Sequence, residues 1–322
     1  MEINTQAEQP TSRNYLITGG SGFIGSALCD RLLGKGHRVT VLTRKYKELT
    51  TTARSGATFI GSFADLPSTA KFDVVINLAG EPVVGPRWTT ERRAALHASR
   101  RDLTQALVGW IKSADFKPAL MISASAIGYY GVQDENDPTQ LTENAPPQNI
   151  FMSELCKEWE KSATALEASG VPVAIIRLGV VLADVNSGKG ALPKMVQPLR
   201  FGVGGRIGSG RQIISWVHLD DVLGVIDFLQ SRPVEQIRGV HNLCAPQPAS
   251  QSEFMREAQR WIGPFAHLPA PVPQWVLKLA LGEQAGLLVQ GQRVIPLRLL
   301  DLGYQFRWPT LSSALKDCLH RV

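Results

Sequence analysis

The sequence predicts an α/β fold in which a doubly wound parallel sheet is covered by helices on both faces, with a smaller second domain. Short, unbroken apolar runs alternate with helix-like segments between residues 15 and 182. Strands that are apolar along their whole length are typical of parallel sheets, because both faces of each strand are buried. A glycine-rich turn follows the first apolar run and precedes a helix-like segment, which is the connection that such a fold requires.

The predicted elements start at Tyr15 and follow the order strand, glycine turn, helix, strand. Predicted strands are YLIT, HRVTVLTR, FDVVINLAG, ALMISASA and VPVAIIRLG, and predicted helices include ERRAALHASRRDLTQALVGWIKSA and SELCKEWEKSATALEASG. After Leu182 the chain becomes a Gly-rich loop region, WVHLDDVLGVIDFLQ then has helical spacing, and PQWVLKLALG is a helical piece near the end. This pattern predicts a flexible tail at residues 1–13, a larger α/β domain at 14–182 plus 214–244, and a smaller α/β substrate domain at 183–213 plus 245–322.

Length and composition support a folded chain with more than one domain. The 322 residues exceed the usual size of one compact core. Hydrophobic residues make up 44% and charged residues 19% of the chain, which excludes general disorder. The net charge is +6, but the Lys and Arg residues are dispersed without interleaved aromatic residues, so we expect no nucleic-acid binding.

Targeting and metal-binding signals are missing from the sequence. The polar segment MEINTQAEQPTSRN lacks the apolar centre of a signal peptide, and no apolar run reaches the roughly 18 residues of a membrane span. The four cysteines have neither close pairing nor metal-ligand spacing. They are Cys29, Cys156, Cys244 and Cys318. We therefore expect reduced thiols, a cytoplasmic protein, no membrane association and no metal site.

The glycine turn predicts a dinucleotide site. It lies between a predicted strand and a predicted helix, the context in which such a motif is meaningful. Gly19 permits the tight turn, Gly22 lets the backbone approach a pyrophosphate, and Gly25 lets the helix pack closely on the strand. The helix then points its unpaired N–H groups at the phosphates. The expected cofactor contacts in this turn are Gly19, Gly20, Ser21, Gly22, Phe23, Ile24 and Gly25.

The end of the second predicted strand favours NADP(H) over NAD(H). A free ribose 2′-hydroxyl is usually met there by Asp or Glu. This chain has Thr43 and Arg44 instead, followed by Lys45. A hydroxyl and a guanidinium can bind a 2′-phosphate, and no carboxylate repels it. A solvated basic strand end is the alternative interpretation.

Further motifs occur in a characteristic order. The spacing Thr-Gly-x-x-Gly-x-x-Gly, followed by Asn77-Leu78-Ala79-Gly80 and Ser123-Ala124-Ser125, resembles the extended (atypical) short-chain dehydrogenase/reductase superfamily. The remaining motifs look like those of its NAD(P)-dependent epimerase family proteins, a subfamily related to nucleoside-diphosphate-sugar epimerases with a distinctive C-terminal domain. These motifs are Gly80-Glu81, Arg87-Trp88, Ser99-Arg100, Tyr129-Tyr130-Gly131, Lys157-Glu158-Trp159-Glu160, SWVHLDD at residues 215–221, NLCAP at 242–246 and Gly282-Glu283.

The resemblance implies a Rossmann domain, NADP(H) as the cofactor and a cytoplasmic or organellar setting, and it leaves the substrate open. Arg100 lies in a helical run that would carry its guanidinium to the cofactor. A solvated helix face formed by Arg100 and Arg101 is the alternative. Carried over to matching positions, the contacts beyond the glycine turn would be Thr43, Arg44, Leu78, Ala79, Gly80 and Arg100, with Leu178 and Gly179 near the nicotinamide.

The Tyr-x-x-x-Lys pair that performs acid-base chemistry in the superfamily is absent. In that pair the two side chains share one helix face, because four residues make about one turn. Glu160 fits the glutamate that follows the lysine by four residues, which places Cys156 at the lysine position and Met152 at the tyrosine position. No tyrosine of the chain is followed four residues later by lysine. Lys157 lies one residue too late, about 100° around the helix.

Three other residues are candidates for catalysis. Ser125 fits the serine that hydrogen-bonds the reacting oxygen, and Tyr129 or Tyr130 would supply a phenol from another direction. The alternatives are that Ser125 only bonds the strand end and that the tyrosines only pack. Further acid-base candidates are Glu81, Glu143, His218 and Asp221. For the last two, the alternative is that WVHLDD ties the loop back to the larger domain.

Two hypotheses about function follow. The first is an NADP(H)-dependent oxidoreductase or sugar-nucleotide epimerase for a small substrate that is anionic or nucleotide-linked. The second is a noncatalytic NADP(H)-sensing regulatory or scaffold protein that orders its C-terminal domain for a protein partner. The sequence therefore leaves open whether the protein is an enzyme. Candidates for a cationic and aromatic rim around an anionic substrate are Arg87, Trp88, Lys194, Arg206 and Arg211.

Overall fold

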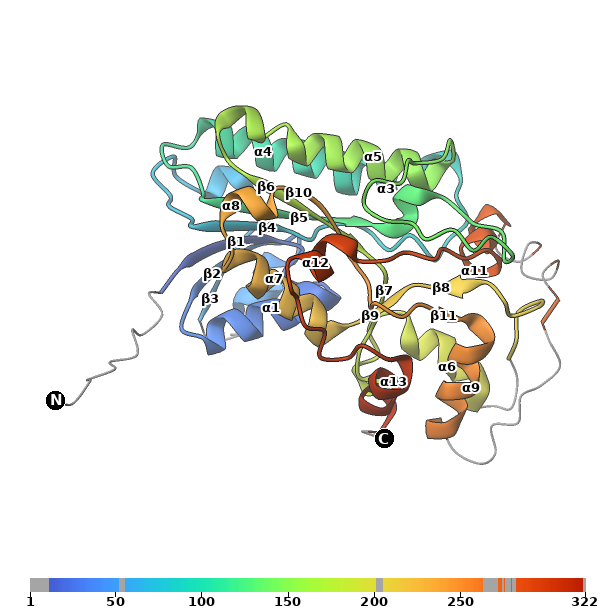
Figure 1. Ribbon diagram of the computed structural model, residues 1–322. Helices are drawn as coiled ribbons and strands as arrows, with labels where there is room; N and C mark the ends of the chain where they lie inside the picture. The colour runs from blue at the N-terminus through green and yellow to red at the C-terminus, as the bar shows by residue number, and fades with distance from the viewer. Residues whose placement is uncertain are drawn as a thin grey trace.

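A parallel sheet of seven strands forms the centre of the protein, in the order β3-β2-β1-β4-β5-β6-β10 (Figure 1). The computed structural model describes residues 12–51, 56–200, 205–262, 272–273, 275, 279 and 282–320. Strand order reverses direction between β1 and β4, and every neighbouring pair is parallel, which confirms the predicted doubly wound Rossmann-type sheet. The strands are β1 (Asn14–Thr18), β2 (Arg38–Leu42), β3 (Ala57–Ile60), β4 (Val74–Asn77), β5 (Leu120–Ala126), β6 (Val173–Leu178) and β10 (Gly239–Leu243).

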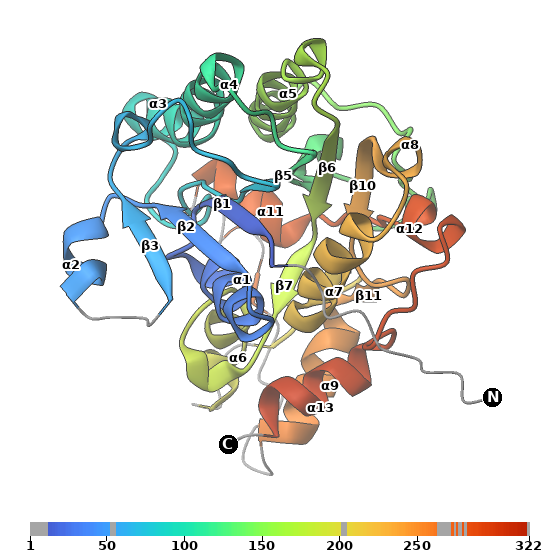
Figure 2. The same cartoon turned by 90° about the vertical axis from the view of Figure 1, so that its left-hand side faces the viewer.

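Helices cover both faces of this sheet, with α3, α4 and α5 over one face and α1 and α7 over the other (Figures 1 and 2). Leu16 packs in one cluster with Leu107 of α4, whereas its neighbour Ile17 packs in another with Leu28 of α1. This alternation arises because successive residues of a strand point to opposite faces. Within the described ranges, no helix is both long and apolar enough to cross a bilayer. The covering helices are α1 (Phe23–Gly34), α3 (Thr90–His97), α4 (Leu103–Ser113), α5 (Phe151–Thr164) and α7 (Leu219–Gln230).

A second hydrophobic cluster lies apart from the sheet and joins α6, α9 and α13. It is built around buried side chains such as Leu182, Val196, Trp216, Phe254 and Leu315. Two small sheets, β7 with β9 and β8 with β11, accompany these helices. The elements are α6 (Leu192–Arg200), α9 (Gln251–Ile262), α13 (Leu311–Leu319), β7 (Val180–Leu182), β8 (Ile213–Ile214), β9 (Trp216–His218) and β11 (Ala249–Ser250).

The region predicted as a Gly-rich loop contains a helix, so that part of the prediction is wrong. α6 forms because Leu192, Val196 and Leu199 recur at helical spacing and are buried in the second cluster. The predicted helical piece PQWVLKLALG lies largely outside the described residues. The division into two domains and the N-terminal tail stay predictions. Shorter helices are α2 (Tyr46–Thr51), α8 (Val234–Ile237), α11 (Gly286–Val289) and α12 (Leu297–Asp301).

Polar side chains join the carboxyl ends of the central strands. Asn77 at the end of β4 accepts a hydrogen bond from the Thr18 hydroxyl at 2.6 Å, and its amide donates to Thr104 at 2.9 Å and Ser123 at 3.0 Å. All four side chains are buried. In a doubly wound sheet, ligands bind outside this edge of the strands, so the network fixes the floor of the candidate site.

Candidate functional site

The glycine turn between β1 and α1 packs directly against the end of β4. Gly19 has a φ of 72°, and a Cβ there would lie 2.7 Å from the carbonyl carbon of Leu78 and 2.8 Å from the amide nitrogen of Ala79. A Cβ on Gly25 would collide with the carbonyl oxygen of Gly19. The turn is closed by a 2.9 Å hydrogen bond from the Gly22 N–H to the same oxygen. Glycine is therefore required at both positions, and the predicted residues Leu78 and Ala79 do lie beside the turn.

The N-terminus of α1 is open to an anion. Gly22 is its N-cap residue and offers no side-chain hydrogen bond, and the first turn contains no acidic residue. Phe23 and Ile24 begin the helix and are partly exposed. Uncapped N–H groups and the positive end of the helix dipole favour a phosphate at this place. Gly20 has no room for a Cβ, which would lie 2.7 Å from the Val41 side chain.

The end of β2 supplies a hydroxyl and an exposed guanidinium next to the turn. The Thr43 side chain is buried, and its Oγ1 lies 3.0 Å from the Ser21 hydroxyl, which links β2 to the glycine turn. The Arg44 side chain is 89% exposed, and its Nη1 lies 3.5 Å from Oε1 of Glu81. This weak contact leaves Arg44 able to meet a ligand phosphate.

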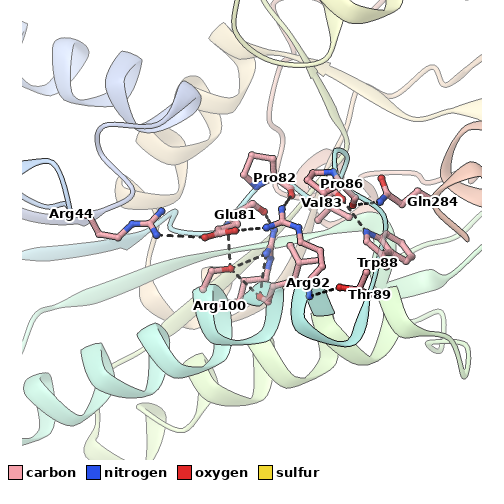
Figure 3. Close-up of polar contacts among 12 residues, drawn as sticks. Arg44, Glu81, Pro82, Val83, Pro86, Trp88, Thr89, Arg92, Arg100 and Gln284 are labelled. Carbon is pink, nitrogen blue, oxygen red and sulfur yellow. Dashed lines mark hydrogen bonds and ion pairs between the residues drawn. The ribbon is translucent and has the colours of Figure 1, made fainter. Parts of the chain in front are cut away.

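Glu81 is the centre of a charged cluster after β4 (Figure 3). Its carboxylate accepts a 2.5 Å hydrogen bond from Arg92, and this bond holds the pKa of Glu81 below its usual value despite partial burial. Arg100 donates at 2.7 Å to the backbone carbonyl of Glu81, and a Cβ on Gly80 would lie 3.2 Å from its guanidinium carbon. Arg92 and Arg100 thus hold the loop through the side chain and the backbone of Glu81, respectively, next to the predicted cofactor residue Gly80.

Arg100 is buried rather than solvated. It is 8% exposed, lies in a π-helical turn at Ala98–Asp102 between α3 and α4, and also donates to the Leu96 carbonyl at 3.3 Å. Burial lowers its pKa. The alternative of a solvated face is therefore wrong for Arg100, whereas the Arg101 side chain is 42% exposed. In the structure Arg100 fixes the loop after β4, and π-helical turns of this kind are frequent at functional sites.

Ser125 and Tyr130 belong to a buried network that the sequence did not predict, although both residues were candidates for catalysis. The Ser125 hydroxyl donates a hydrogen bond to Glu160 at 2.6 Å, and Arg177 donates two hydrogen bonds of 2.8 Å to the same carboxylate. Arg177 also donates to the Tyr130 hydroxyl at 2.8 Å, which in turn donates to Asn242 at 2.6 Å. Burial raises the pKa of Tyr130 to about 12, so this phenol keeps its proton at neutral pH.

Tyr129 differs from these two residues because it is only partly buried. The guanidinium carbon of Arg177 lies 3.4 Å from the centre of its ring, and the Tyr130 ring meets it edge-on at 5.5 Å. No side-chain hydrogen bond to its hydroxyl is present among the described residues. Of the three catalytic candidates, Tyr129 is therefore the one whose ring is fixed while its hydroxyl stays uncommitted.

Helix α5 places Met152, Cys156 and Glu160 on its buried face. Met152 and Cys156 are buried, whereas Lys157 is exposed and does not take the place of the missing lysine. Burial raises the pKa of the Cys156 thiol to about 12, so the thiol is no nucleophile at neutral pH.

Leu178 and Gly179 lie at the crossing from β6 to β7. Gly179 donates from its backbone N–H to the Leu243 carbonyl at 3.0 Å, and a Cβ there would lie 2.7 Å from the Ser215 carbonyl oxygen. The backbone at this edge of the sheet is therefore fixed from two sides. Both residues are partly buried, next to strand β5 that carries Ser125.

The acid-base candidates Glu143, His218 and Asp221 have structural partners. Glu143 accepts backbone hydrogen bonds from Asn242 at 3.0 Å and Arg298 at 3.3 Å. His218 caps α7, lies 3.3 Å from Asp317 and packs against Trp308. Asp221 is buried and accepts backbone hydrogen bonds from Arg307 at 2.8 Å and Trp308 at 3.0 Å. His218 and Asp221 therefore connect α7 to the C-terminal segment.

The rim candidates are only partly available to a substrate. Arg87 donates to the Leu279 carbonyl, and Arg211 pairs with Glu135 at 2.6 Å. Trp88 donates to the Val83 carbonyl at 3.1 Å and packs against Phe151. Lys194 and Arg206 are exposed.

Two cations of the candidate site, Arg177 and Lys189, were not predicted from the sequence. Arg177 stands in the otherwise apolar run VPVAIIRLG, and a charge inside a buried strand indicates a buried partner. Apart from its glycine neighbours, nothing in the sequence around Lys189 predicts that it lies beside α1, because only the folded chain brings the two together.

The sheet topology, the glycine turn and the open helix end define a nucleotide-binding protein of the Rossmann class. The chain belongs to the NAD dependent epimerase/dehydratase family, which matches residues 15–244, and a domain of unknown function, DUF1731, matches residues 272–318. The resemblance inferred from the motifs is thereby confirmed.

Individual relatives cover almost the whole chain. The solved structure of human epimerase family protein SDR39U1 (isoform 2) with NADPH is 31% identical, has a TM-score of 0.82, and covers 96% of this chain and 100% of that one. Epimerase family protein YfhF of Bacillus subtilis is 34% identical over 312 residues, 95% of this chain and 98% of its own. A chloroplastic SDR39U1 homolog of Arabidopsis thaliana is 34% identical over 96% of this chain and 88% of its own. The predicted NADP(H) agrees with the NADPH in the human structure, while the cytoplasmic setting stays a prediction.

Proposed function

We propose that this protein binds NADP(H) and is an NADP(H)-dependent oxidoreductase or epimerase. One observation carries the proposal: a glycine turn without room for side chains lies beside a strand end that presents Thr43 and the exposed Arg44. The pyrophosphate would take the uncapped end of α1, and the 2′-phosphate would take Arg44. The NADPH-bound human relative supports this cofactor.

The other predicted contacts have separate proposed roles. Leu78, Ala79 and Gly80 would border the adenosine, because Leu78 and Ala79 lie against the glycine turn after β4 and Gly80 follows them. Arg100 would act through the loop that it holds, rather than through the cofactor itself. Leu178 and Gly179 would border the nicotinamide.

For the chemistry, we propose Tyr129 as the proton donor or acceptor. The nicotinamide supplies or accepts a hydride at its C4 carbon when bound. Tyr129 would exchange the proton with the reacting oxygen, since its ring is fixed by Arg177 and its hydroxyl is uncommitted. Ser125 and Tyr130 would hold that arrangement through Glu160 and Asn242. The proposed substrate is a small carbonyl or hydroxyl compound, anionic or nucleotide-linked.

Titration of NADPH and NADH by fluorescence tests the cofactor half of the proposal. We expect Arg44→Ala to weaken NADPH about 10- to 100-fold and to leave NADH unchanged, because a charge-assisted hydrogen bond to phosphate is worth about 1.5–3 kcal/mol. Arg38→Ala, at the opposite end of β2, is the matched control. Absence of NADPH binding by the wild-type protein would refute the proposal.

Two assays across a panel of carbonyl and hydroxyl metabolites test the catalytic half. NADPH absorbance follows net oxidation or reduction, and NMR of the substrate follows epimerisation, which returns the hydride and leaves the cofactor unchanged after each turnover. We expect Tyr129→Phe to abolish turnover of any compound found while NADPH still binds. A panel broad in sugar nucleotides that gives no turnover with wild-type protein would count against an enzyme. Unchanged turnover in Tyr129→Phe would remove Tyr129 from the mechanism.

A further inference from the structure

The loop that follows β7 packs against the first turn of α1. A Cβ on Gly190 would lie 2.8 Å from the ring of Phe23, so the loop backbone rests directly on that ring. The neighbouring Lys189 brings its ammonium to 3.4 Å from the hydroxyl of Ser26 on the same helix. Two segments more than 160 residues apart in sequence therefore meet at the end of α1 where the glycine turn closes.

The loop holds its shape without the side chain of Lys189, whose backbone N–H donates to the Ser187 hydroxyl at 3.2 Å. Asp184 accepts a hydrogen bond from the backbone of Asn186 at 2.9 Å and caps the short turn Val185–Ser187. Gly188 and Gly190, on either side of Lys189, have φ values of 64° and 81°, which only glycine adopts readily. The lysine is thus presented from a preformed loop, so binding need not order the loop backbone.

The charge of Lys189 has no counter-charge in the part of the chain that the structure describes. Among the described residues, its ammonium contacts the Ser26 hydroxyl and has no carboxylate within ion-pair range. The two cations at the other end of α1 differ, since Arg31 and Lys35 each lie 2.7 Å from Asp227. The first turn of α1 adds no acidic residue. Positive charge is therefore in local excess at this end of α1, because Lys189 is exposed, the helix end is uncapped and the first turn contains no acidic residue.

We propose that Lys189 is a cofactor-binding residue that closes over the pyrophosphate of NADP(H) from the side opposite the glycine turn. The inference rests on the proposed cofactor site and adds to it a contact outside the glycine motif. The pyrophosphate would lie between the N–H groups of α1 and the Lys189 ammonium. Lys189 would act on any dinucleotide equally, whereas Arg44 would act on the 2′-phosphate alone.

The test compares three ligands on Lys189→Ala, Lys189→Gln and Arg44→Ala. Dissociation constants for NADPH and NADH come from fluorescence titration, and the constant for 2′-AMP comes from displacement of NADPH. We expect both Lys189 variants to weaken NADPH and NADH by the same factor, about tenfold, and to leave 2′-AMP unchanged because it has no pyrophosphate. Arg44→Ala should weaken NADPH and 2′-AMP and spare NADH. Lys112→Ala, an exposed lysine of α4, is the charge control.

The outcomes separate this inference from the proposed function. Wild-type protein without NADPH binding would overturn both. Wild-type binding with unchanged constants in the Lys189 variants would overturn the inference alone. A loss for NADPH that spares NADH would also overturn it, since the lysine would then contact the 2′-phosphate. Circular dichroism and the thermal midpoint show that each variant is folded.

Discussion

Replacement of Arg177 by methionine should destabilise the protein strongly, because it leaves a carboxylate buried without its partner. The Arg177 and Glu160 side chains are 3% and 11% exposed, and two hydrogen bonds of 2.8 Å join them. Burial alone lowers the pKa of Arg177, but the hydrogen bonds and charge of Glu160 outweigh burial and raise it. We expect Arg177→Met to cost about 3–5 kcal/mol of unfolding free energy, the usual effect of breaking a buried pair.

Removing both partners should cost less than removing one. In Arg177→Met with Glu160→Leu, no charge is stranded, and the loss is reduced to the hydrogen bonds of Ser125 and Tyr130, about 1–3 kcal/mol. Urea unfolding at pH 7 without cofactor gives the free energies, because a bound ligand would add its own stabilisation. Free energies that simply add in the double variant would refute a coupled pair. Arg101 with Glu158, an exposed pair at 3.5 Å, is the control and should show no measurable coupling.

Two further predictions concern the glycine turn and a buried histidine. Gly25→Ala should abolish NADPH binding and lower the free energy of unfolding by about 1–3 kcal/mol, because its Cβ has no space beside Gly19. Gly34→Ala in the same helix is the control and should be neutral or stabilising, because there is open space around Gly34. NADPH titration and urea unfolding measure both effects. Burial lowers the pKa of His241 from 6.5 to about 4, so the unfolded chain takes up its proton first as pH falls. The contribution to stability is complete above pH 6.5 and is lost toward pH 4, about 2 kcal/mol between pH 7.5 and pH 5. His241→Gln should remove this part of the pH dependence of the urea midpoint, and an unchanged dependence would show that His241 does not cause it.

The fold was predictable because its signals are local. An unbroken apolar strand indicates that both of its faces are buried, and a glycine turn indicates close backbone contact. Each of these signals is carried by a few adjacent residues. α6 was missed because its flanking glycines and Pro198 suggest a loop. Its helical state depends on Leu192, Val196 and Leu199 meeting the second cluster, which is a tertiary effect that overrides the local preference.

The cofactor part of the candidate site was predictable from local sequence, whereas the network around Ser125 was not. The contact of Gly19 with Leu78 and Ala79 follows from a known backbone geometry, so the motif was enough. The network joins Ser125, Glu160 and Arg177, which come from three different elements. Ser125 lies 35 residues and Arg177 lies 17 residues from Glu160 in sequence. Glu160 was recognised only as a marker of the helix frame, and nothing in the spacing predicted which groups would share its carboxylate.

The same network explains why the usual lysine has no place on α5. Cys156 is buried, and the guanidinium groups of Arg100 and Arg177 are close enough to oppose the rise in its pKa. A lysine at this position would add a third cation to a buried region where Glu160 is already fully engaged by Arg177 and Ser125. Its ammonium would be desolvated and repelled, and its pKa would fall. The proposed acid-base chemistry therefore needs a group other than a lysine of α5, which is why we propose Tyr129, whose ring lies against Arg177.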